Sequence, residues 1–232
     1  RDTHDLLEGR LGSGFEVLSL FGRMAGAEQQ RIFAPGRQRR VIIATNVAET
    51  SITIPRIRCV VDTGLARISR YNAPKRTKRL PVEAVSQSSA NQRAGRAGRV
   101  RDGVCIRLYS EEDYLRRERY TPPEIQRTNL AAVVLQMLTL GLGDVEQFPF
   151  IDPPDSRMVR DGYKLLEELG AVSAAGKLTD VGVRMSRLPV DPRLARMVLA
   201  AGEQGCLQEM LVITSALTAQ DPRERPADKQ QQ

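Results

Sequence analysis

Three short apolar runs in the first half of the chain constrain its fold most. They lie at residues 41–45, 58–62 and 104–109, and polar or helical stretches separate them. Runs of this kind are typical of strands that are buried on both faces of a parallel sheet. Residues 15–20 predict a further strand, and residues 27–33 predict a helix. This alternation predicts an α/β domain with a parallel sheet, in which ligands bind beyond the carboxyl ends of the strands.

After Thr121-Pro122-Pro123 the pattern of the chain becomes helical. The spacing of apolar residues predicts helices at residues 129–140, 158–169, 179–188, 193–203 and 207–217. Thr179 is the expected N-cap of the third helix, and residues 171–178 are interpreted as a short hairpin. Helices grouped around a hairpin at this size fit a winged-helix module. The Gln-rich end, residues 220–232, has the composition of a disordered segment.

Positive charge is concentrated in one part of the chain, whose formal net charge is +7. Residues 67–101 hold ten Lys or Arg and a single acid, Glu83. With so few carboxylates nearby, this stretch favours phosphate binding. A solvated basic face is the alternative.

The cysteines and the single histidine argue against a metal site. Cys59, Cys105 and Cys206 are isolated, and the first two lie in apolar runs, which predicts buried thiols in a reducing compartment. His4 lies in a polar start, which disfavours histidine-based catalysis. No apolar stretch approaches the roughly 18 residues that a membrane span needs, and nothing resembles a signal peptide. We therefore expect a cytoplasmic protein.

The run Gln92-Arg93-Ala94-Gly95-Arg96-Ala97-Gly98-Arg99 is the strongest chemical signal. Residues three or four positions apart share one face of a helix, so the arginines are predicted to cluster. A glycine inside a helix costs about 1 kcal/mol, which suggests that another surface approaches closely here. Arginines bind phosphate through two parallel hydrogen bonds and stabilise charge in phosphoryl transfer. The alternative is a basic helix that merely touches nucleic acid.

A second polar segment follows the predicted strand at residues 41–45. Residues 44–54 are dense in hydroxyl and amide side chains, which cannot all be helix caps. A loop with several small donors at the end of a strand is suited to holding phosphate oxygens. An ordinary capped turn is the alternative.

These two segments resemble motifs V and VI of superfamily 2 helicases of the DEAH-box type. Residues 18–33 resemble the segment that holds motif IV, and Arg107-Leu108-Tyr109-Ser110 follows motif VI as in that family. Residues 149–154 and 165–171 resemble its winged-helix domain, and residues 178–192 lead into its helical-bundle (ratchet) domain. The resemblance covers nearly the whole chain and is strongest to bacterial members.

The resemblance implies a nucleotide site shared by two RecA-like domains, of which this chain would hold the second. Arg96 and Arg99 match the arginines that reach the γ-phosphate, and Gln92 matches a glutamine that positions phosphate or the attacking water. Phe33 matches an aromatic residue that stacks on adenine. Ser51 matches a serine that senses the nucleotide state, and Thr53 is taken with it as nucleotide-binding.

The resemblance also implies contacts to RNA. Thr45 and Asn46 match residues that contact the RNA backbone, which makes binding insensitive to sequence. Strand-like flanks around residues 72–75 match a β-hairpin inserted between the two motifs, and a solvated loop is the alternative. The candidate RNA-binding residues of this hairpin are Arg70, Lys75, Arg76 and Lys78. The chain departs from the family at Pro55, where many relatives carry an acid that touches the ribose.

The function expected from the resemblance is ATP hydrolysis coupled to 3′-to-5′ movement on single-stranded RNA and to duplex unwinding. The sequence contains no G-x-x-x-x-G-K-[ST] loop, so ATP and Mg²⁺ are expected to be held mainly by the first RecA-like domain. The chain alone is therefore expected to be inactive. The expected partners are single-stranded RNA and the first RecA-like domain, and the sequence leaves open whether DNA also binds. We expect a monomer that does not associate with a membrane. The alternative is a non-catalytic winged-helix module that binds nucleic acid or protein.

The expected domains follow from the same likeness. They are a RecA-like domain at residues 1–123 with a hairpin at about 65–85, a winged helix at 124–190, the start of a helical bundle at 191–219 and a tail at 220–232. The sequence opens on a predicted helix, residues 2–10. Because an α/β unit normally begins with a strand, we expect the first domain to begin upstream.

Overall fold

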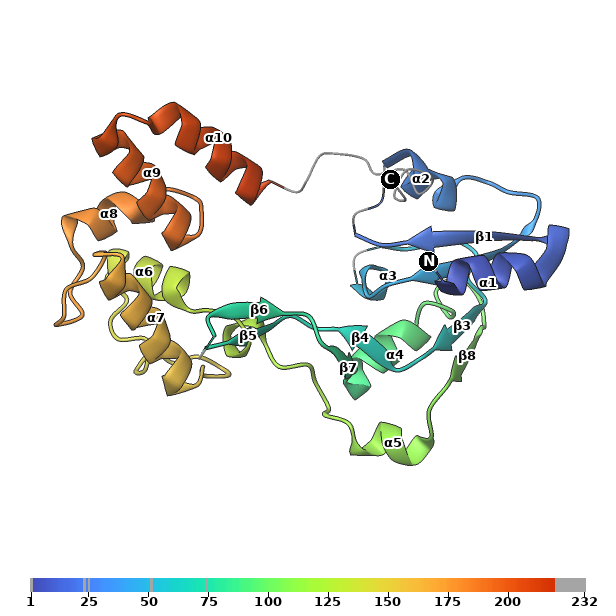
Figure 1. The fold of residues 1–232 in the computed structure, drawn as a ribbon. Helices are drawn as coiled ribbons and strands as arrows, with labels where there is room; N and C mark the ends of the chain where they lie inside the picture. The colour runs from blue at the N-terminus through green and yellow to red at the C-terminus, as the bar shows by residue number, and fades with distance from the viewer. Residues whose placement is uncertain (1, 23, 25, 51, 74, 220–232) are drawn as a thin grey trace. The chain divides into compact units, whose positions relative to one another are not determined.

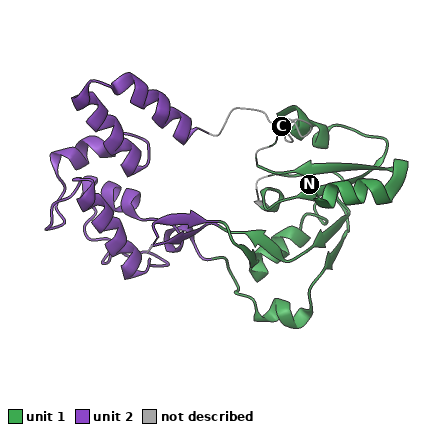
Figure 2. Ribbon diagram, viewed as in Figure 1, with its two compact units in different colours: residues 1–68, 80–121 green, residues 69–79, 122–232 purple. Residues whose placement is uncertain are grey.

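The computed structural model describes residues 2–22, 24, 26–50, 52–73 and 75–219. The predicted disordered tail, residues 220–232, lies outside the described residues. The chain divides into two compact units, which Figure 2 shows in different colours. The first unit is Arg1–Ile68 with Leu80–Thr121, and the second is Ser69–Arg79 with Pro122–Gln232.

The first unit contains two pairs of parallel strands (Figure 1). Strand β1 (Phe15–Leu20) pairs with β2 (Arg39–Ala44), and β3 (Cys59–Asp62) pairs with β8 (Val104–Arg107). The helices are α1 (Asp2–Leu11), α2 (Gly26–Phe33), α3 (Val47–Thr50), α4 (Gln87–Ala94) and α5 (Glu111–Arg116), with a short 3-10 turn at Gly12–Gly14. The predicted α/β class with parallel strands is confirmed.

A small core holds the β1–β2 half of this unit together. Leu18, Leu20 and Ile32 are buried, and Ile42, Ile52 and Ile54 pack against them. Parallel β1 and β2 require a crossover, and α2 supplies it by placing Ile32 over the strands. The carboxyl end of β2 therefore leads directly into α3 and the polar loop behind it.

The prediction that the apolar strands are buried on both faces was wrong for β3 and β8. Val61 is 59% exposed and Val104 is 61% exposed. Because Cys59 pairs with Val104 and Val61 with Ile106, these side chains share one face, and all are exposed. Cys59 is therefore not the buried thiol that its apolar neighbours predicted.

The other side of this strand pair is more closely packed. Cys105 is half-buried, and burial raises the pKa of its thiol. Asp62 is buried on β3, against which α4 packs. Apolar composition thus predicted the strands, whereas the neighbours of each face decided their burial.

An antiparallel hairpin leaves the first unit between β3 and α4. Strand β4 (Leu65–Arg67) pairs with β7 (Val82–Ala84) in the first unit. Strand β5 (Arg70–Asn72) pairs with β6 (Thr77–Arg79), and this outer part belongs to the second unit. The hairpin is thus one ribbon whose two halves belong to different compact units.

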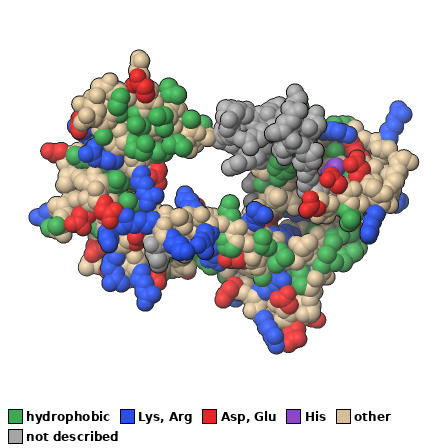
Figure 3. Space-filling view, in the orientation of Figure 1, with side chains coloured by type: hydrophobic (Ala, Val, Ile, Leu, Met, Phe, Trp, Pro, Cys, Tyr) green, Lys and Arg blue, Asp and Glu red, His purple; other side chains and the backbone are tan. Residues whose placement is uncertain are grey.

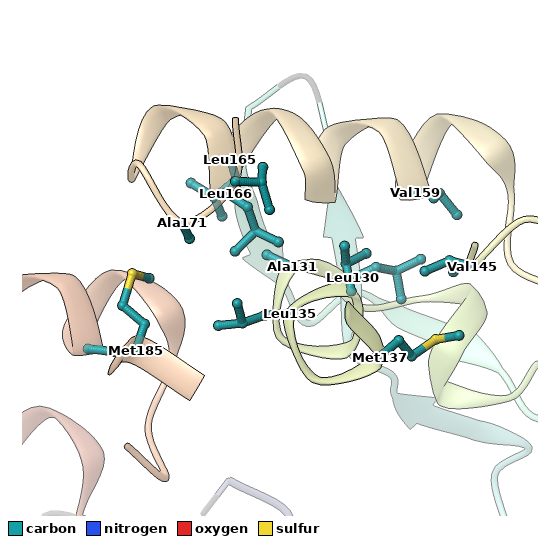
Figure 4. Packing of buried hydrophobic residues seen from close by; sticks show 13 residues of the cluster. Leu130, Ala131, Leu135, Met137, Val145, Val159, Leu165, Leu166, Ala171 and Met185 are labelled. Carbon is teal, nitrogen blue, oxygen red and sulfur yellow. The ribbon is translucent and has the colours of Figure 1, made fainter. Parts of the chain in front are cut away.

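The second unit is built from helices around one apolar core. They are a 3-10 turn at Glu124–Gln126 and the helices α6 (Ala131–Thr139), α7 (Ser156–Glu168), α8 (Asp180–Ser186), α9 (Pro192–Gln204) and α10 (Leu207–Thr218). Leu130, Leu135 and Leu166 belong to the core in Figure 4, where side chains of α6 and α7 meet. Gly162 lets the helices approach, since a Cβ there would lie 3.1 Å from the Ala131 nitrogen.

The segment between α7 and α8 is short and tightly turned. The hairpin predicted at residues 171–178 contains a single bridge, between Val172 and Leu178. Thr179 caps α8 as predicted, because its side chain accepts a hydrogen bond from the Gly182 amide at 3.1 Å. The capping hydroxyl also donates to the Gly170 carbonyl at 2.6 Å, which fixes the start of α8 against the end of α7.

Candidate functional site

The arginine run begins on α4 but does not stay helical. Ser86 caps α4 by accepting a hydrogen bond from the Ser89 amide at 3.1 Å, and the helix ends at Ala94 with Gly95 as its C-cap. Arg96 then lies in tight turns, its amide donating to the Arg93 carbonyl at 3.0 Å. The prediction of one helical face was wrong, because the two glycines disfavour continuation of the helix.

The predicted close approach at the glycines of the run lies elsewhere in this unit. A Cβ on Gly98 would meet nothing within 4 Å. The tight contact is instead at Gly103, where a Cβ would lie 2.7 Å from the Cβ of buried Ala97. Glycine at position 103 lets the end of the run pack against the start of β8.

The three arginines nevertheless converge on the polar loop after β2. Arg93 Nε lies 3.0 Å from Glu49 Oε2. Arg96 donates to the carbonyl oxygens of Glu49 and Ile52, the latter at 3.0 Å. Arg99 donates to the hydroxyl of Thr53. The two segments that the sequence singled out therefore form a single site.

Arg96 differs from an ordinary ion-paired arginine, because its acceptors are backbone carbonyls. Burial lowers the pKa of Arg96, and repulsion from Arg99 lowers it further. Its Nε is buried and has no hydrogen-bond partner among the described residues. An arginine stays charged in proteins, so this charge is only partly compensated. Two neighbouring guanidinium groups with free donor capacity suit a phosphate group.

The other predicted nucleotide-binding residues are spread over this unit. Gln92 is exposed on α4, and Phe33 is 38% exposed at the end of α2. Thr53 lies in the loop and accepts from Arg99. Ser51 lies outside the described residues. The structure thus brings Thr53, Arg96 and Arg99 together, whereas Phe33 comes from a separate helix.

The predicted RNA-binding residues Thr45 and Asn46 are exposed at the start of α3. The Thr45 amide donates to the Leu20 carbonyl at 3.0 Å, which holds the end of β2 against β1. The carbonyls of Thr45 and Asn46 accept from the Ala48 and Glu49 amides, so both backbones are fixed while the side chains face outward. They are therefore well placed to act at the carboxyl end of a parallel strand.

The predicted RNA-binding residues of the hairpin have different surroundings. Lys75 and Lys78 are exposed, and Arg70 is half-buried. Arg76 instead pairs with Glu168 of α7, at 2.9 Å between Nη2 and Oε1, and its Nε lies 3.5 Å from Asp161. Figure 3 shows Lys and Arg side chains gathered over the hairpin strands. Arg76 is therefore held by two carboxylates of α7.

Sequence reasoning missed the acids that organise these arginines. Glu49 and Asp62 hold Arg93, and Asp161 and Glu168 hold Arg76. A signal existed for the second pair, since residues seven apart share one face of a helix. No local signal identified the first pair.

Within the ranges given above, no three His, Cys, Asp or Glu side chains are grouped so that they could hold a metal ion. None of the helices in the described part of the chain is long and apolar enough to cross a membrane.

Comparison with known proteins matches three family models along the chain. The helicase conserved C-terminal domain matches residues 1–101, the winged-helix part of the helicase associated domain (HA2) matches 163–190, and its ratchet-like part matches 191–232. The chain is also 56% identical over 236 residues to ATP-dependent RNA helicase HrpA of Escherichia coli. The chain belongs to the DEAH-type helicase family.

The chain is also similar to a eukaryotic helicase, and it spans only part of the length of the relatives that it matches. It is 42% identical over 208 residues to the human probable ATP-dependent RNA helicase DHX35, covering 88% of this chain and 30% of that protein. The match to E. coli HrpA covers 100% of this chain but only 18% of that relative.

Solved structures give the same family. Two crystal structures of E. coli HrpB, described as a DExH-box NTPase and as a DEAH/RHA helicase, match with TM-scores of 0.83 and 0.84 at 33% identity. They cover 95% and 96% of this chain, and it spans 27% and 28% of theirs. The α/β part of this DEAH-type chain is thus RecA-like, and winged-helix and helical parts follow it, as predicted.

Proposed function

We propose that this chain forms part of an ATP-dependent RNA helicase, in which Arg96 and Arg99 stabilise the charge of the γ-phosphate. The observation that carries the proposal is their convergence on the loop at residues 49–53, where no carboxylate of the described residues pairs with them. An arginine placed at a γ-phosphate contributes about 10³–10⁵ in rate. The likeness to ATP-dependent RNA helicase HrpA and to the probable ATP-dependent RNA helicase DHX35 supports the same proposal.

The residues present fit a triphosphate at this site. The orphaned Nε of Arg96 and the donors of Arg99 are suited to phosphate oxygens. In this proposal Gln92 positions the phosphate or the attacking water, Ser51 and Thr53 contact the nucleotide from the loop, and Phe33 stacks on the base. ATP supplies the free energy of its hydrolysis when bound, and both ATP and Mg²⁺ are held mainly by a first RecA-like domain.

RNA would pass along the surfaces that carry exposed polar and basic groups. Thr45 and Asn46 contact its backbone from the start of α3, and Arg70, Lys75, Arg76 and Lys78 contact it from the hairpin. Because these groups recognise phosphate and sugar, binding is independent of sequence. The protein moves 3′-to-5′ on single-stranded RNA. Single-stranded DNA is the second substrate to test in the same assays.

Residues 1–123 form a RecA-like domain, residues 124–190 a winged helix and residues 191–219 the start of a ratchet domain. The protein acts as a cytoplasmic monomer in which two RecA-like domains close on ATP, and this chain alone is inactive.

The test is RNA-stimulated ATPase activity of the full-length protein with Arg96→Ala or Arg99→Ala. We expect kcat to fall by about 10³-fold or more for Arg96→Ala. Arg101→Ala removes an exposed arginine from the same stretch and is the matched control. ATPase activity near the wild-type rate in Arg96→Ala would sink the proposal. If RNA binding then still depended on the hairpin, a non-catalytic nucleic-acid-binding module would be the better description.

A further inference from the structure

Arg93, the first arginine of the run, is held between two carboxylates. Its Nε lies 3.0 Å from Glu49 Oε2, and its Nη1 lies 2.9 Å from Asp62 Oδ1. The side chains are 15%, 13% and 1% exposed for Arg93, Glu49 and Asp62. The charge of Arg93 is therefore compensated on both sides, which distinguishes it from Arg96 in the same run.

Asp62 provides a fixed anchor for this arrangement. Burial alone would raise its pKa, but hydrogen bonds from the Gly64 amide, Arg93 and Tyr109 hold the pKa of Asp62 below its usual value. The amide and the phenol lie at 2.9 Å and 2.8 Å from the carboxylate. A charged, fully hydrogen-bonded carboxylate at the end of β3 thus fixes one side of Arg93.

The surroundings of Asp62 are rigid for a packing reason. Arg117 lies 3.8 Å above the centre of the Tyr109 ring and donates to the Gly64 carbonyl at 2.8 Å. Gly64 has a φ of +71°, and a Cβ there would lie 2.6 Å from atoms of Tyr109 and Arg117. Only glycine fits this position without a clash. The stacked pair of Tyr109 and Arg117 therefore packs directly against the backbone next to Asp62.

Glu49 connects this anchor to the proposed phosphate-binding arginines. Its side chain accepts from Arg93, and its backbone carbonyl accepts from Arg96. Glu49 therefore contacts Arg93 through its side chain and Arg96 through its backbone. Any shift of Glu49 relative to β3 would move an acceptor of Arg96.

We propose that Arg93 is a positioning residue, which ties Glu49 to Asp62 and thereby holds Arg96 in its working position. It makes no contact with the nucleotide. This inference rests on the proposed function, because it assigns the role of Arg93 in the same ATPase reaction. It predicts that the ion pair between Arg93 and Glu49 affects the rate of the chemical step through Arg96.

The experiment uses the full-length protein with Glu49→Gln, which keeps the shape of residue 49 and its carbonyl but removes its charge. Displacement of a reacting group by about 1 Å costs up to about 10²-fold in rate. We therefore expect kcat to fall on the order of 10- to 100-fold while KM for ATP stays near wild type. Glu49→Asp retains the charge and should recover part of kcat. Glu111→Gln, an exposed acid on α5, is the control.

Arg93→Lys tests the same link from the other side. Lysine is a compact point charge without the planar fork of arginine, so it should not bridge both carboxylates, and kcat should again fall with KM retained. Thermal unfolding is measured in parallel. Variants that lose stability while keeping kcat would overturn the proposal, and so would a raised KM with unchanged kcat, which would indicate direct nucleotide binding.

A double-mutant cycle separates positioning from general damage. If Glu49 acts through Arg96, Glu49→Gln should cost little in an Arg96→Ala background. An equal loss of kcat in both backgrounds would refute positioning. If the Arg96→Ala background is too slow to measure, the comparison of kcat and KM between Glu49→Gln and Glu49→Asp decides. Full activity of Arg96→Ala alone would instead refute the proposed function.

Discussion

Arg76 at the turn of the hairpin and Glu168 at the end of α7 form a bidentate ion pair, in which Nη2 of the arginine lies 2.9 Å from Oε1 of the glutamate. A second hydrogen bond joins Nη1 to Oε2, and Asp161 lies 3.5 Å from Nε. Tyr71 of β5 donates to Asp161 at 2.8 Å. The outer hairpin is therefore anchored to α7 by two of its side chains, Tyr71 and Arg76, which bind Asp161 and Glu168.

The first prediction concerns this anchor. Glu168→Gln should weaken the hold on Arg76, because hydrogen bonding to Arg76 keeps the pKa of Glu168 low and the residue charged. If Arg76 serves as an anchor, Arg76→Ala and Glu168→Gln should both increase hydrogen exchange of the amides of β5 and β6. Because Arg76 is also proposed to contact RNA, Arg76→Ala should lower RNA affinity more than Glu168→Gln does. Unchanged hydrogen exchange of these amides in both variants would contradict the anchor.

The second prediction concerns the exposed lysines of the hairpin. Lys75 and Lys78 are exposed, so each is available to a phosphate. Each change to alanine should lower RNA affinity equally for all sequences and reduce the slope of log K against log salt by about 0.7. Lys164→Ala removes a lysine from α7 and is a suitable comparison. An unchanged slope in Lys75→Ala, measured by titration at several salt concentrations, would exclude a phosphate contact there.

The third prediction concerns pH and Asp62. Its folded-state pKa lies below its unfolded value of about 3.9, so the carboxylate contributes stability that is complete above that value. The contribution is lost as the pH falls through the lower, folded pKa. Asp62→Asn should cost on the order of 3 kcal/mol at neutral pH, since it breaks a buried ion pair. Denaturant unfolding at several pH values should show this difference shrinking in acid.

Asp102→Asn, at an exposed aspartate of the first unit, provides the control for the pH series. It should leave unfolding unchanged at every pH. A stability difference for Asp62→Asn that stayed constant from neutral pH down to strong acid would show that the charge of Asp62 is not responsible.

The fourth prediction concerns packing in the second unit. A Cβ on Gly182 would lie 2.8 Å from Leu178 Cδ1 and 3.0 Å from the Ala171 carbonyl carbon, so Gly182→Ala should destabilise by about 1–3 kcal/mol. Gly202→Ala in α9 is the matched control, because a Cβ there meets nothing within 4 Å. It should stabilise by about 0.5–1 kcal/mol. Equal melting temperatures for the two variants would contradict this packing.

The sequence by itself determined most of the local structure and indicated the chemistry of the site. Apolar runs predicted the parallel strands, helical spacing predicted α6 to α10, and Thr179 predicted its own cap, because these depend on residues that are neighbours along the chain. Residues 44–54 and 92–99 were likewise predicted to be a pair of phosphate-binding segments, from their own composition and their resemblance to helicase motifs.

Only the tertiary structure decided which charges meet. The helix at the arginine run stops at Ala94, yet the arginines still converge, because the turns after Gly95 bring Arg96 and Arg99 to the loop at residues 49–53. In the sequence, nothing distinguishes Arg93 and Arg76 from the other arginines near them. In the structure, each forms ion pairs with acids that are far away along the chain. Ion pairs depend on distances of a few ångströms in space, which local sequence patterns do not contain.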